Sequence, residues 1–126
     1  MSKQNLYLGK SGEESAVGFL KKNGYKIVVK NYKTKLGEID IIAHDKDTIA
    51  FIEVKTRRSD RFGLPQEAVL SYKQRQMAKA ALVFLKENNL LDKKARFDVV
   101  SVMYSQGVPK LDLIKNAFEL EERYVI

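Results

Sequence analysis

Residues 37–58, Gly-Glu-Ile-Asp-Ile-Ile-Ala-His-Asp-Lys-Asp-Thr-Ile-Ala-Phe-Ile-Glu-Val-Lys-Thr-Arg-Arg, decide the fold. Two isoleucine-rich runs, 38–43 and 48–55, flank the polar group 44–47, which predicts two β-strands joined by a tight turn. Residues two apart in a strand share a face, so pairing through this turn would place Asp40 and Glu53 near each other on one face. A buried strand disfavours charge, so these carboxylates need a partner or a task.

Working outward, a helix is expected from about Ser11 to Asn23, capped by Ser11 with Glu14 and ended by Gly24. The other expected elements are strands at 25–32, 38–43, 48–55, 96–103 and 111–114, and a second helix at 71–88. The short connections among the first three strands imply an antiparallel meander. This order predicts an α/β fold with a mixed sheet of about five strands, flanked by helices. No repeat or linker divides residues 1–126, which are expected to form one domain with an extended or mobile tail from about residue 119.

The charge balance suggests a polyanionic partner. The chain has 23 Lys and Arg residues against 16 Asp and Glu residues, a formal charge of +7 and a pI near 9.5. Nucleic acid is the commonest such partner, although a solubilising surface is the alternative. The absence of cysteine excludes disulfides and thiolate metal sites, and a single histidine leaves a zinc site short of ligands. Without a membrane-length apolar run or secretory signal, a cytoplasmic protein with no membrane partner is expected.

The paired carboxylates predict a site for a divalent cation. Two neighbouring carboxylates repel each other, burial raises the cost of ionising both, and a cation removes that cost. Mg²⁺ accepts one or two carboxylates with water, so Asp40, Glu53 and the main-chain carbonyl of Val54 are its candidate ligands, with Mn²⁺ as a substitute. Lys55 would orient a metal-bound water and stabilise charge growing on a phosphate. This arrangement suits metal-assisted phosphodiester hydrolysis.

A simpler alternative is a neutralising pair of Glu53 and Lys55 at a strand end, which contributes little. Glu-x-Lys alone is a weak signal, and its combination with Gly37-Glu-Ile-Asp40 one strand earlier favours the site. Arg57, Arg58 and Arg61 follow in the next loop. We expect them to contact backbone phosphates without reading sequence.

Asp40 followed by Glu53-x-Lys55 resembles the PD-(D/E)xK nuclease superfamily, although Ile39 replaces its proline. The chain as a whole, from Gly9 to Phe118, resembles the YraN-like family of uncharacterised bacterial proteins. The matching segments are Gly12-Glu13-x-x-Ala16-x-x-x-Leu20, Asn31, Gly37-Glu-Ile-Asp-Ile-Ile-Ala43, Phe51-Ile-Glu-Val-Lys-Thr-Arg57, Phe62-Gly63, Lys73, Ala80-Ala81, Arg96-Phe-Asp-Val-Val100 and Asn116-Ala-Phe118.

The resemblance implies a restriction-endonuclease-like, three-layer fold, similar to that of archaeal Holliday-junction resolvases. By this likeness Glu13 is a fourth active-site residue, whereas its position alone also suits a first-turn acid favoured by the helix dipole. The likeness also places Lys73 or Gln74 near phosphate, with a solvated helix end as the alternative. It further implies a homodimer, in which two-fold symmetry would pair two sites across a junction.

The expected function is a Mg²⁺-dependent endonuclease acting on DNA, on branched or damaged structures in particular. The alternative is a binding module of the same fold that holds nucleic acid without cleaving it. A basic protein associated with RNA or ribosomes would share the charge but leave the buried acids unexplained.

Overall fold

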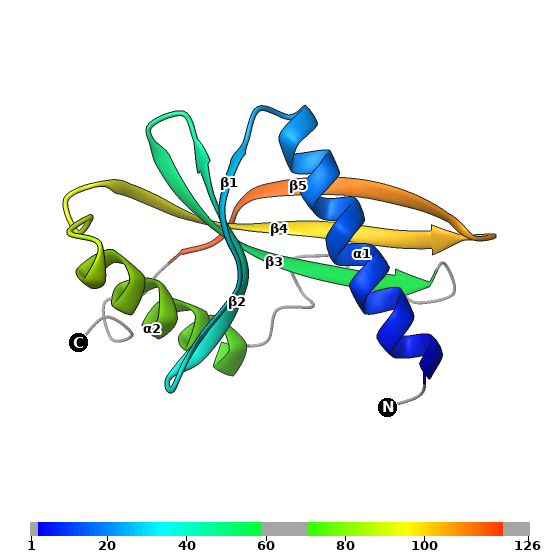
Figure 1. Ribbon diagram of the computed structural model, residues 1–126, viewed down its shortest axis with the longest axis horizontal. Coiled ribbons are helices and arrows are strands. Elements are labelled where there is room, and N and C mark those ends of the chain that lie inside the picture. Colours follow the sequence, from blue (N-terminus) through cyan, green and yellow to red (C-terminus); the bar gives the residue numbers. More distant parts are fainter. Residues whose placement is uncertain (1–2, 59–70, 120–126) are drawn as a thin grey trace.

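The computed structural model describes residues 3–58 and 71–119. Its elements follow the chain in the order helix, three strands, helix, two strands (Figure 1). They are α1 (Lys3–Lys22), β1 (Lys26–Thr34), β2 (Gly37–Asp45), β3 (Thr48–Arg58), α2 (Ser71–Glu87), β4 (Lys94–Ser105) and β5 (Val108–Phe118).

The strands form one five-stranded sheet in the order β1-β2-β3-β4-β5. The neighbours are antiparallel except for β3 and β4, which are parallel and connected through the segment that contains α2. The expected meander and mixed sheet are confirmed. The turn between β2 and β3 is tighter than expected, because Asp45 pairs with Thr48 and only Lys46 and Asp47 remain between them.

Each helix covers one face of the sheet, which confirms the three layers (Figure 1). On one face Ala16 and Leu20 of α1 pack into a buried cluster with Ile52 of β3. On the other face Met77 of α2 packs into a second cluster with Phe51. Phe51 and Ile52 are adjacent in β3, so their alternation gives the strand one apolar surface for each helix.

Helix α1 begins at Lys3, so the expected start at Ser11 is wrong. Ser11 does not cap the helix; its hydroxyl lies 2.9 Å from the Tyr104 hydroxyl of β4. At the next position a Cβ would collide with the Thr56 side chain, so Gly12 lets α1 approach β3 closely. The sequence offered a plausible cap, but packing against the sheet uses these residues inside a longer helix.

Strand β2 bends where it leaves β3. Ile39 and Ile41 were expected on one face, yet Ile39 packs on the α2 side and Ile41 on the α1 side. The β2–β3 ladder ends at Ile41 and Ile52, whereas β2 remains paired with β1 as far as Gly37. The β1–β2 hairpin therefore separates from β3 next to Asp40, which leaves a gap in the sheet at that point.

Within the described part of the chain, neither helix is long and apolar enough to cross a membrane.

Candidate active site

Asp40 lies at the point where β2 and β3 separate. Its Oδ2 atom accepts a 2.8 Å hydrogen bond from the main-chain N–H of Val54 in β3. The carboxylate thus takes the place of the β2 backbone carbonyl that this N–H would meet if the ladder continued. The two-residue turn sets a register in which Asp40 approaches Glu53, as the sequence predicted.

Glu53 is a buried carboxyl group with incomplete partners. Its side chain is 6% exposed; Oε1 lies 3.6 Å from Nζ of Lys55, and Oε2 has no hydrogen-bond partner among the described residues. Burial, followed by the charge of Asp40, raises the pKa of Glu53 to about 7, while Lys73 and Lys55 lower it. The ion pair with Lys55 therefore offsets only part of the cost of ionising Glu53, and the neutralising pair stays the alternative interpretation.

Glu13 reaches the same place from α1. Because α1 begins at Lys3, Glu13 is not in the first turn, and the helix-dipole alternative is wrong. Burial and the charges of Asp40 and Glu38 raise the pKa of Glu13. Between α1 and the β1–β2 hairpin lies a pocket of about 310 Å³. It is lined by Lys10, Glu13, Glu14, Val17, Lys30, Asn31, Asp40 and Ile41.

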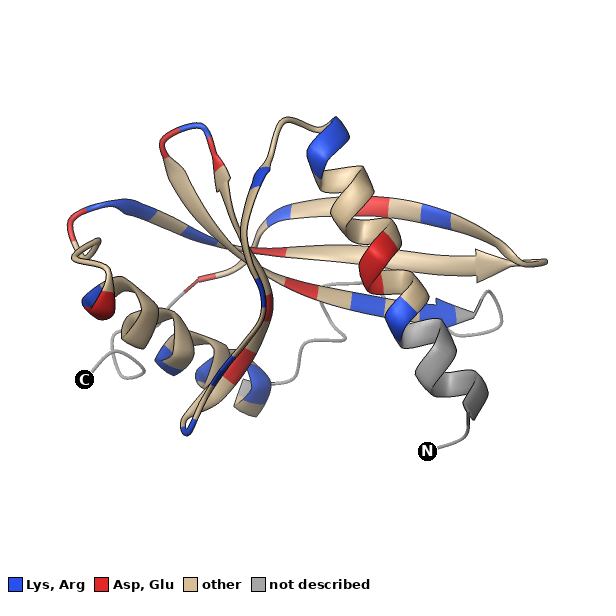
Figure 2. Ribbon diagram, in the orientation of Figure 1, with Lys and Arg blue, Asp and Glu red and all other residues tan. Residues whose placement is uncertain are grey.

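Lys73 approaches the carboxylates from the first turn of α2. Its Nζ lies 3.9 Å from Oε1 of Glu38, and its charge lowers the pKa of Glu53. The side chain is only 20% exposed, so it is not a solvated helix end. Figure 2 shows acidic residues on α1, β2 and β3 where the hairpin leaves the sheet, with basic residues at the hairpin tip and at the start of α2.

The remaining candidates are only partly described. Arg57 and Gln74 are half-buried. The side chain of Arg58 and all of Arg61 lie outside the described residues. Val54 contributes its N–H to Asp40, and a role for its carbonyl stays a prediction.

The donor set suits a hard cation with few protein ligands. Among residues 3–58 and 71–119, no group of three or more His, Cys, Asp or Glu side chains is placed to hold a metal ion. Mg²⁺ needs only one or two carboxylates, since water and substrate phosphate complete its coordination. The pair of Asp40 and Glu53, with the orphan Oε2 of Glu53, fits this requirement.

Sequence reasoning gave no role to Asn31, Lys30 or Lys10, which line the pocket beside Asp40. Asn31 stands across from Asp40 in the β1–β2 ladder with a positive φ of 54°. Asparagine adopts this conformation more readily than most residues, but its position within a strand gave no turn signal. The distortion was therefore invisible in the sequence.

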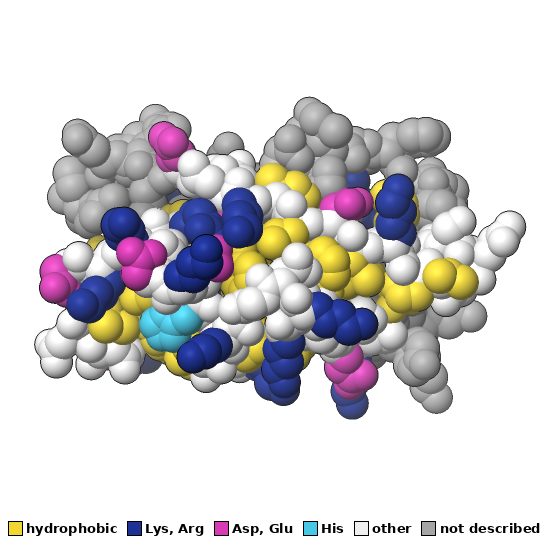
Figure 3. Space-filling model, turned by 90° about the horizontal axis from the view of Figure 1, so that it is seen from above, with side chains coloured by type: hydrophobic (Ala, Val, Ile, Leu, Met, Phe, Trp, Pro, Cys, Tyr) yellow, Lys and Arg dark blue, Asp and Glu magenta, His cyan; other side chains and the backbone are white. Residues whose placement is uncertain are grey.

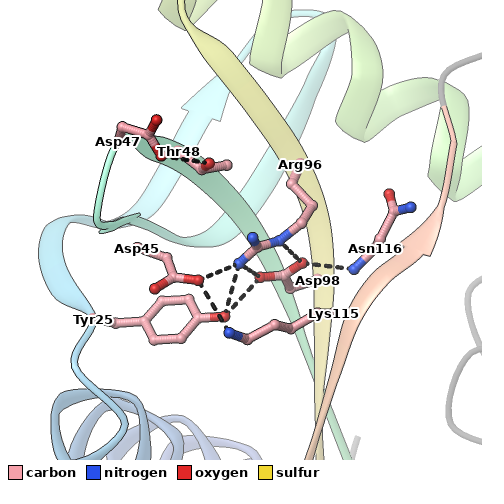
Figure 4. Close-up of polar contacts among 8 residues, drawn as sticks. All are labelled: Tyr25, Asp45, Asp47, Thr48, Arg96, Asp98, Lys115 and Asn116. Atoms are coloured by element: carbon pink, nitrogen blue, oxygen red, sulfur yellow. Dashed lines mark hydrogen bonds and ion pairs between the residues drawn. The ribbon is translucent and has the colours of Figure 1, made fainter.

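A second group of charged residues lies at the other end of β2 (Figure 4). Asp98, fully buried in β4, accepts hydrogen bonds from Nε and Nη2 of Arg96 at 2.8 and 2.9 Å. It also accepts bonds from the Tyr25 hydroxyl and from the N–H of Asn116 at 3.0 and 2.9 Å. Nη2 of Arg96 lies 2.8 Å from Oδ2 of Asp45, so the group joins β2, β4, β5 and the start of β1.

Sequence reasoning missed this network as a unit. The available signal was an opposite-charge pair, Arg96 and Asp98, two residues apart and therefore on the same face of a strand that continues with Val99 and Val100. Their partner Tyr25 lies 73 residues from Asp98, beyond the reach of any local pattern.

The chain has similar proteins in many bacteria. The family described as Uncharacterised protein family UPF0102 matches residues 12–102. A UPF0102 protein of Geobacter metallireducens is 51% identical over 120 residues, which cover 95% of this chain and 98% of that protein. Those of Syntrophus aciditrophicus and Caldicellulosiruptor saccharolyticus are each 50% identical, over 93% and 88% of this chain and 92% and 96% of their own lengths. The similarity therefore extends along nearly the whole fold.

Proposed function

The chain belongs to the uncharacterised, YraN-like protein family UPF0102, and we propose that it is a metal-dependent endonuclease acting on DNA. The observation that carries the proposal is Glu53: a buried carboxyl group with an orphan oxygen and a pKa raised to about 7, beside Asp40 and Lys55. Strongly perturbed groups of this kind concentrate at functional sites. The net charge of +7 supports a polyanionic substrate.

Asp40 and Glu53 would hold the cation, Mg²⁺ or its substitute Mn²⁺, together with the main-chain carbonyl of Val54. When bound, the cation would offset the repulsion between the carboxylates and supply Lewis-acid activation of phosphodiester and water. The orphan Oε2 of Glu53 supports this assignment, because an unpaired buried oxygen destabilises the fold and a bound cation would supply its missing partner.

Lys55 would hold the attacking water and stabilise negative charge on the phosphate, since its ammonium group lies beside Glu53. Glu13, whose pKa is raised, would hold or pass a proton from the α1 side. Lys73 would contact the phosphate next to the pair. Gln74, Arg57, Arg58 and Arg61 are proposed to contact the DNA backbone without reading sequence.

Net charge alone does not place the DNA. On the face shown in Figure 3, Lys and Arg side chains are spread among acidic and apolar ones. The placement instead rests on the lysines beside the carboxylates, Lys55 and Lys73. Phosphate contacts there would make binding depend strongly on salt.

A panel of linear, flapped and four-way DNA substrates tests the proposal with Mg²⁺ or Mn²⁺. Asp40→Asn and Lys55→Ala should each reduce cleavage by about 100-fold or more, since each removes a charge acting on the reacting phosphate. Asp47→Asn, an exposed acid whose side-chain partners among the described residues are Lys94 and Thr48, is the matched control and should cleave like wild type. If no substrate distinguishes Asp40→Asn from wild type, the chain is the alternative, a binding module.

A further inference from the structure

The tip of the β1–β2 hairpin carries an exposed apolar side chain among lysines. Thr34 pairs with Gly37, so Lys35 and Leu36 alone form the tip. Leu36 is 53% exposed, and Lys33 and Lys35 are exposed beside it. Figure 2 shows this basic tip extending beyond the sheet alongside the start of α2.

The tip is held firmly. The Thr34 hydroxyl accepts hydrogen bonds from the N–H groups of Leu36 and Gly37, at 3.0 and 3.1 Å, and donates one to the Gly37 carbonyl at 2.9 Å. A Cβ at Gly37 would collide with the main chain of Gln76, so the hairpin lies directly against α2. An exposed leucine on an anchored turn is presented outward at little cost in ordering on binding.

A basic hollow lies between this tip and the first turn of α2. It has a volume of about 380 Å³, and its charged lining consists of Lys33, Lys35 and Lys73 with one acid, Glu38. Glu38 and Lys73 form an ion pair at 3.9 Å, and the charge of Lys73 also acts on Glu53. The excess of lysine suits a backbone phosphate, and Lys73 is the residue that the hollow shares with the surroundings of Glu53.

We propose that Leu36 is a wedge that stacks against the last base pair at a branch point in DNA, with Lys33 and Lys35 holding the flanking phosphates. Apolar side chains used in this way partially unstack a base step, and a base pair at a branch has already lost a neighbour. The wedge role rests on the proposed function and deepens it, because it makes branched DNA rather than continuous duplex the preferred substrate.

The spacing predicts where cleavage would fall. Leu36 and Asp40 are four positions apart, a span of at most about 13 Å along a strand. This corresponds to about four nucleotides at ~3.4 Å per nucleotide. The scissile bond should therefore lie about three to five nucleotides from the branch.

The test measures binding apart from cleavage, in the Asp40→Asn background without Mg²⁺. The probes are a flapped duplex, a four-way junction and a linear duplex of equal length, each with 2-aminopurine at the branch or the matching position. The parent should bind branched probes about tenfold or more tightly than duplex and unstack the reporter base, because stacking of a base on an inserted side chain adds to the affinity. Leu36→Asn should lose that preference while its affinity for linear duplex changes less than about twofold.

Leu91→Asn is the matched control, since Leu91 is 56% exposed and follows the opposite end of α2. It should keep the preference. Lys33→Gln with Lys35→Gln should weaken binding to all probes and reduce the salt slope by about 1.8, whereas Lys79→Gln with Lys86→Gln should not.

Equal binding to branched and linear probes, an unchanged Leu36→Asn variant, or an equal loss in Leu91→Asn would overturn the wedge. Tighter binding to an RNA duplex than to branched DNA would also overturn it. If branch preference depends on Leu36 but the otherwise wild-type chain cleaves nothing, only the nuclease proposal fails. Cleavage without preference, or far from the branch, removes only the wedge.

Discussion

Two groups of buried charge lie in the same sheet, and they differ in how completely their oxygens are paired. Asp98, fully buried, accepts four hydrogen bonds, from Arg96, Tyr25 and the backbone of Asn116. Glu53, which is 5% exposed, has an oxygen with no partner among the described residues, and the negative charge of Asp40 acts on it. The two acids are thus almost equally buried, but both oxygens of Asp98 accept hydrogen bonds and one oxygen of Glu53 accepts none from the described residues.

The difference separates a structural cluster from a candidate site. Around Arg96, hydrogen bonds to Asp98 and Asp45 hold the guanidinium charged, and the Arg96 hydrogen bond lowers the pKa of Asp45. Around Glu53, burial and Asp40 raise the pKa instead. A satisfied network fixes how the strands meet, whereas an unsatisfied carboxylate pair stores repulsion that a bound cation can relieve.

The largest expected effect is on the satisfied network. Asp98→Asn should lower the free energy of unfolding by about 3–5 kcal/mol, because it leaves the Arg96 charge without its main buried partner. Urea denaturation monitored by circular dichroism measures the change. Asp47→Asn, which removes an exposed partner of Lys94, should be indistinguishable from wild type. A loss for Asp98→Asn no larger than that of Asp47→Asn would remove the structural role assigned to the network.

Neutralising Glu53 should raise the free energy of unfolding above neutral pH, whereas Asp98→Asn lowers it. The pKa of Glu53 is about 7 in the folded chain against an ordinary 4.5, so between these values the folded state binds more protons than the unfolded state. The Glu53 contribution to stability is therefore present at low pH and falls as pH rises through that window, by about 3 kcal/mol.

Glu53→Gln removes that pH dependence, so relative to wild type it should gain stability between pH 5 and pH 8. The exposed residue Glu14 supplies the control, and Glu14→Gln should show no such gain. A Glu53→Gln variant that is as destabilised at pH 8 as at pH 5 would show that Glu53 stabilises the fold through its ion pair with Lys55.

A divalent cation should stabilise only the unsatisfied pair. At pH 8, Mg²⁺ at about ten times its dissociation constant should raise the free energy of unfolding by ~1.4 kcal/mol. Asp40→Asn should abolish this increment and Tyr25→Phe should leave it intact, because Tyr25 belongs to the other group. Thermal unfolding with Mg²⁺, compared with the same ionic strength of Na⁺, measures it. An equal increment in Asp40→Asn would show that the cation binds at another site.

The smallest effect should follow loss of one hydroxyl group from the satisfied network. Tyr25→Phe removes the hydroxyl that donates to Asp98 and accepts from Arg96, but the Arg96–Asp98 pair remains. The expected loss is about 1 kcal/mol. Tyr32→Phe is the matched control, since its hydroxyl makes one exposed 3.3 Å bond to Glu87, and it should lose less. Equal losses would mean that burial adds nothing to the Tyr25 bond.

The local part of the fold could be predicted from sequence. The two-residue alternation expected for strands is seen in β3, where the adjacent Phe51 and Ile52 face different helices. Where a contact from a distant element intervened, prediction failed. Ser11 has every property of a cap, yet it contacts Tyr104, 93 residues away, inside a helix that begins at Lys3.

The candidate site divides in the same way. The turn at Lys46 and Asp47 sets the register that brings Asp40 to Glu53, because a short hairpin leaves few alternative pairings. The positions of Glu13 and Lys73 depended on how each helix crosses the sheet. Spacing along the chain does not encode those crossings, and only the resemblance to known nucleases suggested them.

By itself, the sequence determined the strands, the two faces of β3 and the meeting of Asp40 with Glu53, because side-chain alternation and short turns act over a few residues. The tertiary structure alone decided that β2 leaves β3 at Asp40, that Glu53 keeps an orphan oxygen, and that Asp98 does not. The physical reason is that desolvation and hydrogen bonding depend on which distant segments pack around a group. Both acids lie in apolar strands, and only their neighbours in space distinguish them.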